Sequence, residues 1–428
     1  LFNRLVGGRE QEDLQLTPCT FGRKHSSMQH LGVIGPQSIY TSVPEMTWQV
    51  FKCFVHHAFL WMYHGQTCGT SRRNGILGNG SLRQMVLKFP RIHFPKVPSP
   101  YLRNTMGKHL ILGSSGHLGV ELMLGLQERY GANAVVLSDL RPSPHPAAAK
   151  SSFVAADATD FDAQRAIAEN HDVEVIYNLV AILSAQGEAN PMAAWGLNMN
   201  PLLNTLELAR KGAVKRVFWP SSIAVFGSDV PKDGTPQDAS LVPTTVYGVS
   251  KAAGELWCNY YYEKYGVDVR SIRYPGLIGF RSMPGGGTTD YAVSAFHCAM
   301  AGETLTCYLE PNERLPMMSM EDAVRGTLDL MEAPEERIRI RTAYNLSGCD
   351  FTPEELTLAM KGCVPGFEIV YAPDERQDIA ASWPNSLDDS WARNDWDWTP
   401  RHDLRGLVEH IIDGLAKQSN VDKPTLNV

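Results

Sequence analysis

One stretch, residues 108–142, constrains the fold more than any other feature of this chain. It reads KHLILGSSGHLGVELMLGLQERYGANAVVLSDLRP. The apolar run His109–Leu112 is typical of a strand buried in a parallel sheet, and the leucines within Leu118–Leu126 recur every four residues, as on the buried face of a helix. A second apolar run ends at Asp139. The order of these pieces predicts an α/β fold with a doubly wound parallel sheet.

The turn between the first strand and the helix contains three glycines, Gly113, Gly116 and Gly119, in the sequence GSSGHLG. In a Rossmann-type turn the first glycine permits the tight bend, and the second lets the backbone approach a pyrophosphate. The third lets the helix pack close to the strand. The free N–H groups at the start of the helix then bind the phosphates. We expect a dinucleotide here; the alternative is a turn with no ligand.

Asp139 follows Gly119 by twenty residues, at the end of the second predicted strand. A carboxylate at this point accepts hydrogen bonds from the adenosine ribose hydroxyls and repels a 2′-phosphate. Arg141 lies close by and favours NADP, but it follows the acid. The sequence therefore predicts NAD.

Three more predicted strands end in polar or small residues. SFVAADATD ends at Asp157, where an acid often contacts the adenine, and DVEVIYNLVAILSA leaves Ala181 and Ser184 at its end together with Asn178. The strand Arg216–Pro220 runs into two serines. Ligands of open parallel sheets bind at the carboxyl ends of the strands, so we expect the site there.

The sequence VYGVSK places Tyr247 four residues before Lys251, on one face of a helix. Tyrosine is a poor base at neutral pH, with a pKa near 10. A lysine one turn away stabilises the phenolate, which can then take a proton from a substrate alcohol. Ser222 is positioned to hold the substrate oxygen, with Ser221 as the alternative. The alternative, non-catalytic interpretation of a YxxxK pattern is a surface tyrosine beside a solvated lysine.

These motifs together resemble the extended short-chain dehydrogenase/reductase family; the matching pieces are GSSGHLG, SD at 138–139, NLVA, WPSSIAVFG and YGVSK. The resemblance implies that Ser222, Tyr247 and Lys251 form the catalytic triad and that NAD is the cofactor. The predicted NAD contacts are Gly113, Ser115, Gly116, His117, Leu118, Gly119, Asp139, Asp157, Ala158, Leu179, Ala181, Asn198, Tyr247, Lys251, Tyr274 and Ile278.

The C-terminal motifs RYPGLIG, MPGGGTTDYAV and SWPNSLDDSWARNDWDW resemble the threonine-dehydrogenase branch of this family. The resemblance implies oxidation of the L-threonine 3-hydroxyl to 2-amino-3-ketobutyrate and coupling to a 2-amino-3-ketobutyrate ligase. Two rival interpretations are a nucleotide-sugar 4-epimerase of the same fold and a non-catalytic NAD-binding protein.

The glycine-rich stretch GGGTTDY predicts a loop that closes over a small substrate; the alternative is a plain flexible turn. The predicted substrate contacts are Ser184, Ser222, Tyr247, Gly287, Thr288 and Thr289. Asp290 either caps the helix that starts at Tyr291 or binds the substrate ammonium. Arg314 contacts substrate or forms a structural ion pair. The four tryptophans from Trp383 to Trp398 are expected in the core, and no metal site is predicted.

Three regions are predicted: an N-terminal extension at 1–105, an NAD-binding domain at 106–280, and a smaller, mainly helical substrate-binding region at 281–428 with some return to the first domain. Residues 1–105 carry a net charge of +8, against −15 for the rest, and Met46–Val120 contains no Asp or Glu. This is typical of a mitochondrial presequence and indicates the matrix; the alternative is a disordered extension.

Other features of the sequence limit the kinds of partner that we expect for this chain. No apolar run reaches the roughly 18 residues of a membrane span, and the only basic segment is the extension, so neither membrane insertion nor nucleic-acid binding is expected. Eight cysteines without close pairs predict free thiols. The apolar segment 256–265 on the YxxxK helix predicts a homodimer, with core packing as the alternative.

Overall fold

The computed structural model describes residues 107–281 and 283–421. The N-terminal extension and its targeting role therefore lie outside the described residues. Among the residues that are described, no helix is long and apolar enough to cross a membrane. The five cysteines in this part of the chain are free, as predicted: Cys258, Cys298, Cys307, Cys349 and Cys363.

A seven-stranded sheet in the order β10-β6-β5-β4-β1-β2-β3 forms the centre of the described chain, and every neighbouring pair is parallel. Its strands are β1 (Lys108–Leu112), β2 (Val135–Asp139), β3 (Ser152–Ala155), β4 (Val173–Asn178), β5 (Arg216–Ser222), β6 (Asp268–Tyr274) and β10 (Tyr344–Asn345). The strand order reverses direction between β1 and β4, where ligands of such sheets bind. The predicted doubly wound α/β fold is confirmed.

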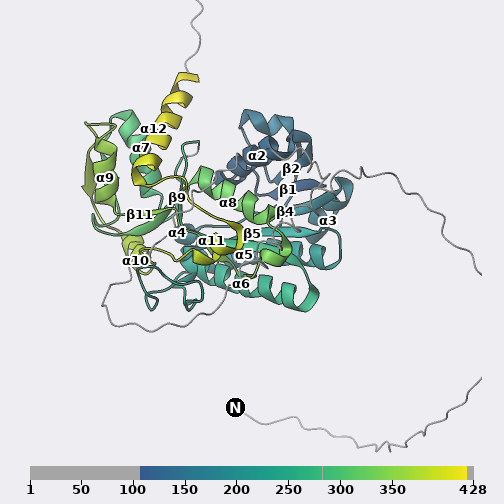
Figure 1. Cartoon of the computed structure of the whole chain (residues 1–428). Helices are drawn as coiled ribbons and strands as arrows, with labels where there is room; N and C mark the ends of the chain where they lie inside the picture. The colour runs from purple at the N-terminus through teal and green to yellow at the C-terminus, as the bar shows by residue number, and fades with distance from the viewer. Residues whose placement is uncertain (1–106, 282, 422–428) are drawn as a thin grey trace, which may run out of the picture. The chain divides into compact units, whose positions relative to one another are not determined.

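Helices cover both faces of this sheet (Figure 1). One face carries α2 (His117–Tyr130) and α8 (Met320–Glu332), and the other carries α3 (Phe161–Asn170), α5 (Pro191–Arg210) and α6 (Val246–Tyr265). Successive strand residues enter opposite cores: Ile111 packs on the α2 side and Leu110 on the α5 side. Strands buried on both faces explain the continuous apolar runs of the sequence.

The C-terminal elements form a third core beside the sheet, in which α12 packs on α7 and α9. It contains two small sheets, β7–β9–β11 and β8–β12. The elements are β7 (Gly276–Ile278), α7 (Tyr291–Ala301), β8 (Leu305–Cys307), β9 (Leu315–Ser319), β11 (Cys349–Phe351), α9 (Pro353–Lys361), β12 (Ile369–Tyr371), α10 (Glu375–Ala381), α11 (Ser390–Trp396) and α12 (Leu404–Val421). Strand β10 also comes from this part of the sequence and pairs with β6.

Helix α6 is held tightly against β5 because small residues face the strand. Thr245 caps the helix by accepting a hydrogen bond from the Gly248 N–H, at 3.1 Å. A Cβ atom at Gly248 would lie 2.1 Å from the Ala224 carbonyl oxygen, and one at Gly254 would lie 2.2 Å from the Trp219 ring. No larger side chain fits at either position. The first turn of α6 is therefore fixed at the carboxyl end of β5.

Candidate active site

A cavity of about 400 Å³ opens at the carboxyl ends of the central strands, at the position that the sequence predicted. Its lining residues come from the turns after β1, β4, β5 and β6, from the first turns of α6, from the loop 285–290 and from two later residues, Met320 and Trp383. The cavity thus combines the nucleotide-binding end of a doubly wound sheet with the glycine-rich loop of the C-terminal part.

The glycine turn fits a dinucleotide pyrophosphate. Gly113 has a φ of +81°, which favours glycine. A Cβ at Gly119 would lie 2.3 Å from the Gly113 carbonyl oxygen, whereas one at Gly116 would meet nothing closer than 3.5 Å. Helix α2 has no side-chain cap and no acidic residue in its first turn. The N–H groups of its first turn are therefore free to bind an anion, and the lack of a side chain at Gly116 leaves the backbone accessible to it.

Asp139 lies beside this turn at the end of β2. Its Oδ2 accepts a hydrogen bond from the Ser115 N–H at 3.0 Å, and its Oδ1 accepts one from the Leu140 N–H at 2.7 Å. The carboxylate is therefore oriented by the backbone, and its remaining lone pairs can accept from ribose hydroxyls. Arg141 is exposed, and its carbonyl oxygen accepts from the Ser115 hydroxyl at 2.7 Å.

Tyr247 and Lys251 line the same wall of the cavity, as the helical spacing predicted. The Lys251 Nζ lies 5.5 Å from the centroid of the Tyr247 ring and donates to the Pro220 carbonyl oxygen at 2.6 Å. The Ser222 side chain is close enough to Tyr247 to lower the pKa of its hydroxyl, and its oxygen accepts from the Ala224 N–H at 3.2 Å. The neighbouring hydroxyl of Ser221 instead donates to a Glu255 carboxylate oxygen at 2.6 Å. Of the two serines, the structure places Ser222 against Tyr247.

Burial governs the titration of both groups in the cofactor-free chain. Burial raises the pKa of Tyr247 to about 12, and the hydrogen bond with Ser222 opposes this rise. Burial lowers the pKa of Lys251 to about 7, against the attraction of Cys258 and Glu255. Burial is the largest influence on the pKa of Tyr247, and the stabilisation of its phenolate by Lys251 and a nicotinamide ring stays a prediction for the NAD-bound enzyme.

A buried ionic network supports this wall from behind. Glu255 accepts hydrogen bonds from the Arg273 guanidinium at 2.9 and 2.8 Å, in addition to that from Ser221. Arg273 also donates to the Asn345 side-chain oxygen at 3.0 Å. The network therefore joins β5, α6, β6 and β10. Since each charge is paired, the burial of Glu255 and Arg273 is compensated.

Further lining residues come from the glycine-rich loop and from the short helix α4 (Ser184–Glu188). The hydroxyl oxygens of Ser184 and Thr288 lie 3.1 Å apart, and both side chains are buried. Gln186 donates to the Gly285 carbonyl oxygen at 3.1 Å. The loop is thus held against α4 in a defined conformation.

Asp290 stabilises the loop from its other end. Its Oδ2 accepts from the Gly285 and Gly287 N–H groups at 2.6 and 2.9 Å. Asp290 occupies the N-cap position of α7, but its side chain makes no capping hydrogen bond. The predicted capping bond is therefore absent, and the carboxylate orders the loop instead. Asp290 also lines the cavity, and its binding of the substrate ammonium stays a prediction.

Fifteen of the predicted site residues line the cavity: Gly113, Gly116, His117, Leu118, Gly119, Leu179, Ala181, Ser184, Ser222, Tyr247, Lys251, Tyr274, Gly287, Thr288 and Thr289. Ser115, Asp139, Asp157 and Ala158 do not line it. Ser115 lies in the glycine turn, Asp139 ends β2, and Asp157 and Ala158 follow β3. The Asp157 carboxylate accepts from the Thr159 N–H and hydroxyl, both at 2.8 Å.

Two predicted cofactor contacts are placed elsewhere. The Asn198 amide bonds to the Ile182 N–H at 2.8 Å and to the Ser250 hydroxyl at 3.0 Å, so it joins the β4 turn to α6. Ile278 is fully buried at the end of β7 and lines a different cavity, between α2 and α8. The Asn198 side chain is thus occupied by hydrogen bonds within the protein and Ile278 by packing, and their contact with the cofactor stays a prediction.

Sequence reasoning missed several lining residues, among them Gln186, Met320 and Trp383. Trp383 was expected in the core; it is buried, yet it also reaches the cavity. Arg314 does not line the cavity and instead pairs with Glu355. Asp322 is buried and accepts from the Arg401 N–H at 2.8 Å, which is a structural role.

The structure also brings together Glu321, His402 and His410, although no metal site was predicted. Glu321 and His402 are 81 residues apart in the sequence. No spacing pattern links residues so far apart, so this group could not be predicted from the sequence.

Comparisons with known proteins agree with this geometry. The model of the family described as NAD dependent epimerase/dehydratase matches residues 109–347. The mitochondrial L-threonine 3-dehydrogenase of Bos taurus is 43% identical over 313 residues, covering 73% of this chain and 83% of that protein.

Two solved structures are also similar. A GalE-like L-threonine dehydrogenase from Cupriavidus necator, in its holo form, is 50% identical with a TM-score of 0.70, covering 72% of this chain and 99% of that chain. A monomeric L-threonine 3-dehydrogenase from a metagenome, in its apo form, is 44% identical with a TM-score of 0.69, covering 72% and 99%.

Proposed function

The chain belongs to the NAD-dependent epimerase/dehydratase family of extended short-chain dehydrogenases, and from this we propose that it oxidises the 3-hydroxyl of L-threonine to 2-amino-3-ketobutyrate, with NAD as the oxidant. The observation that carries the proposal is the composition of one cavity. Ser222, Tyr247 and Lys251 line this cavity together with the Ser184–Thr288 pair. The relatives described above support the choice of substrate.

NAD, when bound, supplies the acceptor for the hydride that leaves the threonine β-carbon. The uncapped start of α2 and the open face of Gly116 bind its pyrophosphate, and Asp139 accepts from its adenosine ribose. Lys251 is positioned to hold the nicotinamide ribose.

Tyr247 takes the proton of the substrate hydroxyl, and Ser222 orients the substrate oxygen. With a pKa of about 12 in the cofactor-free chain, Tyr247 is protonated at neutral pH. It becomes a base only when positive charge lies close to its oxygen. A protonated Lys251 and the positive nicotinamide ring supply that charge together.

The lining favours a small amino acid over a sugar nucleotide. Ser184, Thr288 and Thr289 offer hydroxyl groups for a carboxylate. Within the described residues, the lining contains no arginine, and its one lysine is the buried Lys251. A sugar-nucleotide pyrophosphate is commonly matched by arginine. This composition argues against the epimerase alternative.

The intact triad also argues against a protein that binds NAD without turnover. Tyr247, Lys251 and Ser222 all face the cavity, and a binding function alone requires no such constellation.

We further propose that the enzyme acts in the mitochondrial matrix and that its β-keto acid product passes to a ligase. The acid-free, basic Met46–Val120 segment and the mitochondrial bovine relative support this location. Leu256, Trp257 and Tyr260 are exposed on α6 and support a homodimer. One similar solved protein is described as monomeric, so light scattering after size exclusion is the direct test.

The deciding experiment follows NADH absorbance of the full chain with NAD and L-threonine, and tests UDP-galactose in parallel. NADH formation with threonine alone supports the proposal. Conversion of the sugar nucleotide without net NADH, together with silence toward threonine, would overturn it. A chain that binds NAD and converts neither substrate would be a binding protein.

A further inference from the structure

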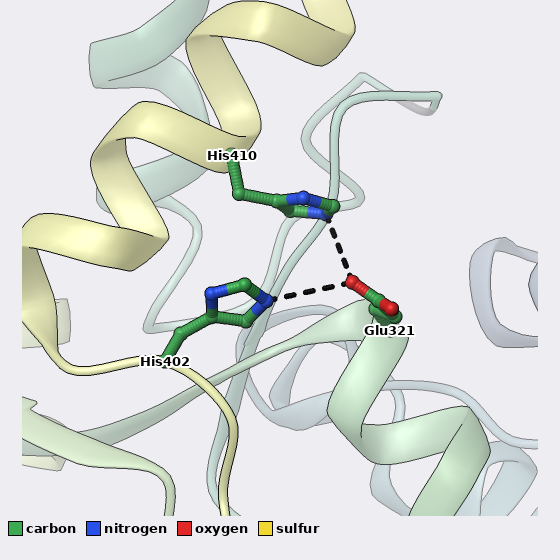
Figure 2. A group of neighbouring side chains, drawn as sticks. All are labelled: Glu321, His402 and His410. Carbon is green, nitrogen blue, oxygen red and sulfur yellow. Dashed lines mark hydrogen bonds and ion pairs between the residues drawn. The ribbon is translucent and has the colours of Figure 1, made fainter.

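Three side chains that do not line the catalytic cavity lie close together, as Figure 2 shows. Glu321 lies in the first turn of α8, His402 precedes α12, and His410 lies within α12. Their potential ligand atoms all lie within 4.8 Å of one another, and no other such group of three occurs among the described residues. We call these three residues the His–Glu cluster.

The two imidazoles approach the same carboxylate oxygen, Oε2 of Glu321. The His402 Nε2 lies 3.4 Å from it and the His410 Nε2 lies 3.6 Å from it (Figure 2). A tetrahedral zinc ion with bonds of about 2.0–2.1 Å keeps its ligand atoms roughly 3.3 Å apart. Both distances are close to this separation. The three ligand atoms all lie within 4.8 Å of one another, so small side-chain rotations bring them to this separation.

The other carboxylate oxygen is already occupied. Oε1 of Glu321 accepts from the Arg401 guanidinium at 2.6 Å. This ion pair leaves Oε2 directed toward the imidazoles and fixes the rotation of the carboxylate. Arg401 therefore orients the proposed ligand without standing between the three ligand atoms.

The backbone around the His–Glu cluster is held by contacts that do not involve it. The buried carboxylate of Asp322 accepts from the Arg401 N–H at 2.8 Å, which positions the residue before His402. Leu407 and Ile411 anchor α12 in the C-terminal core. The geometry of the three ligands is thus set by the fold, as a preorganised ion site requires.

An ion can reach the His–Glu cluster from solvent. The side chains of Glu321, His402 and His410 are 41%, 20% and 30% exposed. A cavity of about 350 Å³ between α2, α8 and α12 is lined by Glu321 and His410 and also by Glu121 and Glu128. The site therefore has an entry path and room for a water ligand.

We propose that Glu321, His402 and His410 bind a divalent transition-metal ion of the zinc class, with water completing a tetrahedron. Two imidazoles and one carboxylate suit Zn²⁺ and Co²⁺, whereas Mg²⁺ and Ca²⁺ prefer oxygen ligands. The ion joins α12 to the start of α8, where the next residue toward the N-terminus, Met320, lines the catalytic cavity. It stabilises that junction and takes no part in hydride transfer.

The test titrates chelator-treated full-length protein with CoCl₂ and follows the visible d–d absorption of tetrahedral Co²⁺. Sites that contain cysteine add a thiolate charge-transfer band at shorter wavelength, so they are distinguished from the His–Glu cluster. We expect His402→Gln, His410→Gln and Glu321→Gln each to weaken Co²⁺ binding at this site at least about tenfold. His145→Gln is the control: His145 lines a cavity next to His410 but lies outside the cluster.

A second measurement uses ZnCl₂ and thermal unfolding. At a concentration a hundredfold above Kd, Zn²⁺ should raise the Tm of the wild type and of His145→Gln by about 3–6 °C, and it should leave the Tm of His410→Gln unchanged. Turnover of His410→Gln should stay near the wild-type value, which separates this proposal from the dehydrogenase activity. Equal Co²⁺ spectra and equal Zn²⁺-induced Tm shifts in the wild type and all cluster variants would overturn the proposal.

Discussion

The hydroxyl oxygens of Ser184 and Thr288 lie 3.1 Å apart in the cavity wall, although 104 residues separate them in the sequence. Ser184 follows the central strand β4, and Thr288 belongs to the glycine-rich loop. The pair therefore joins the nucleotide-binding sheet to the C-terminal region, at the point where we propose that the substrate carboxylate binds.

Removing either hydroxyl should weaken substrate binding more than it slows the chemical step. Because each hydroxyl is worth about one hydrogen bond to a charged group, Ser184→Ala or Thr288→Val should raise the KM for threonine about tenfold and change kcat little. Steady-state NADH production measures both constants. Thr306→Val, at an exposed position on β8, is the control; an unchanged KM in the two wall variants would contradict the assignment.

Tyr247→Phe should abolish proton transfer and leave NAD binding intact. General acid–base catalysis contributes about 10²–10⁴-fold, so kcat should fall by about that factor. NAD affinity can be measured by fluorescence titration. Tyr260→Phe, on the exposed face of the same helix, should behave as the wild type. Substantial turnover by Tyr247→Phe would require another base.

The buried amino group of Lys251 should make the free energy of unfolding depend on pH. Its pKa is about 7 in the folded chain, against about 10.4 in an unfolded one. Between these values the unfolded state binds more protons than the folded state, so stability rises with pH, by up to about 1.4 kcal/mol per pH unit.

Lys251→Met removes this contribution, because methionine does not titrate. Urea unfolding of both proteins from about pH 7.5 to about pH 9.5 should therefore give a wild-type curve that rises relative to the variant. Other titrating groups occur in both proteins and cancel in the difference. Parallel curves would show that Lys251 keeps its proton in the folded state.

Gly119→Ala should damage the pyrophosphate turn. The added Cβ would lie 2.3 Å from the Gly113 carbonyl oxygen, which is backbone and cannot rotate away. We expect NAD affinity to fall at least about tenfold, or about 1.4 kcal/mol. Gly196→Ala, in the interior of α5 with its nearest contact at 4.0 Å, should leave NAD affinity unchanged in the same titration.

Local patterns were enough to predict the strands, the glycine turn and the shared face of Tyr247 and Lys251. Each depends on residues close in sequence, whose period or spacing has one structural solution. The observed bounds of β1, β2 and β4 follow the apolar runs closely. The glycine-rich loop, whose three glycines stand out in the sequence, lines the cavity, and its closure over a substrate stays a prediction.

Contacts between distant segments could not be predicted from local patterns. Nothing in the sequence states that the Asn198 side chain bonds to Ile182 and Ser250, or that Ile278 is fully buried. Spacing reveals the lysine beside Tyr247 but not the depth of burial that raises the pKa of Tyr247. The His–Glu cluster depends on where α12 lies relative to the start of α8, which no local pattern encodes.

The buried network around Arg273 has a consequence for the order in which the protein is made. Arg273 reaches its acceptor Asn345 across 72 residues of sequence. A ribosome adds about 5–20 residues per second, so Asn345 follows Arg273 by roughly 4–14 s. The glycine turn and the strands β1 to β6 are synthesised before that interval ends, whereas the support behind Ser221 and Glu255 is completed only after it. The buried network is therefore completed only after every residue of the glycine turn and of the Ser222–Tyr247–Lys251 triad has been synthesised.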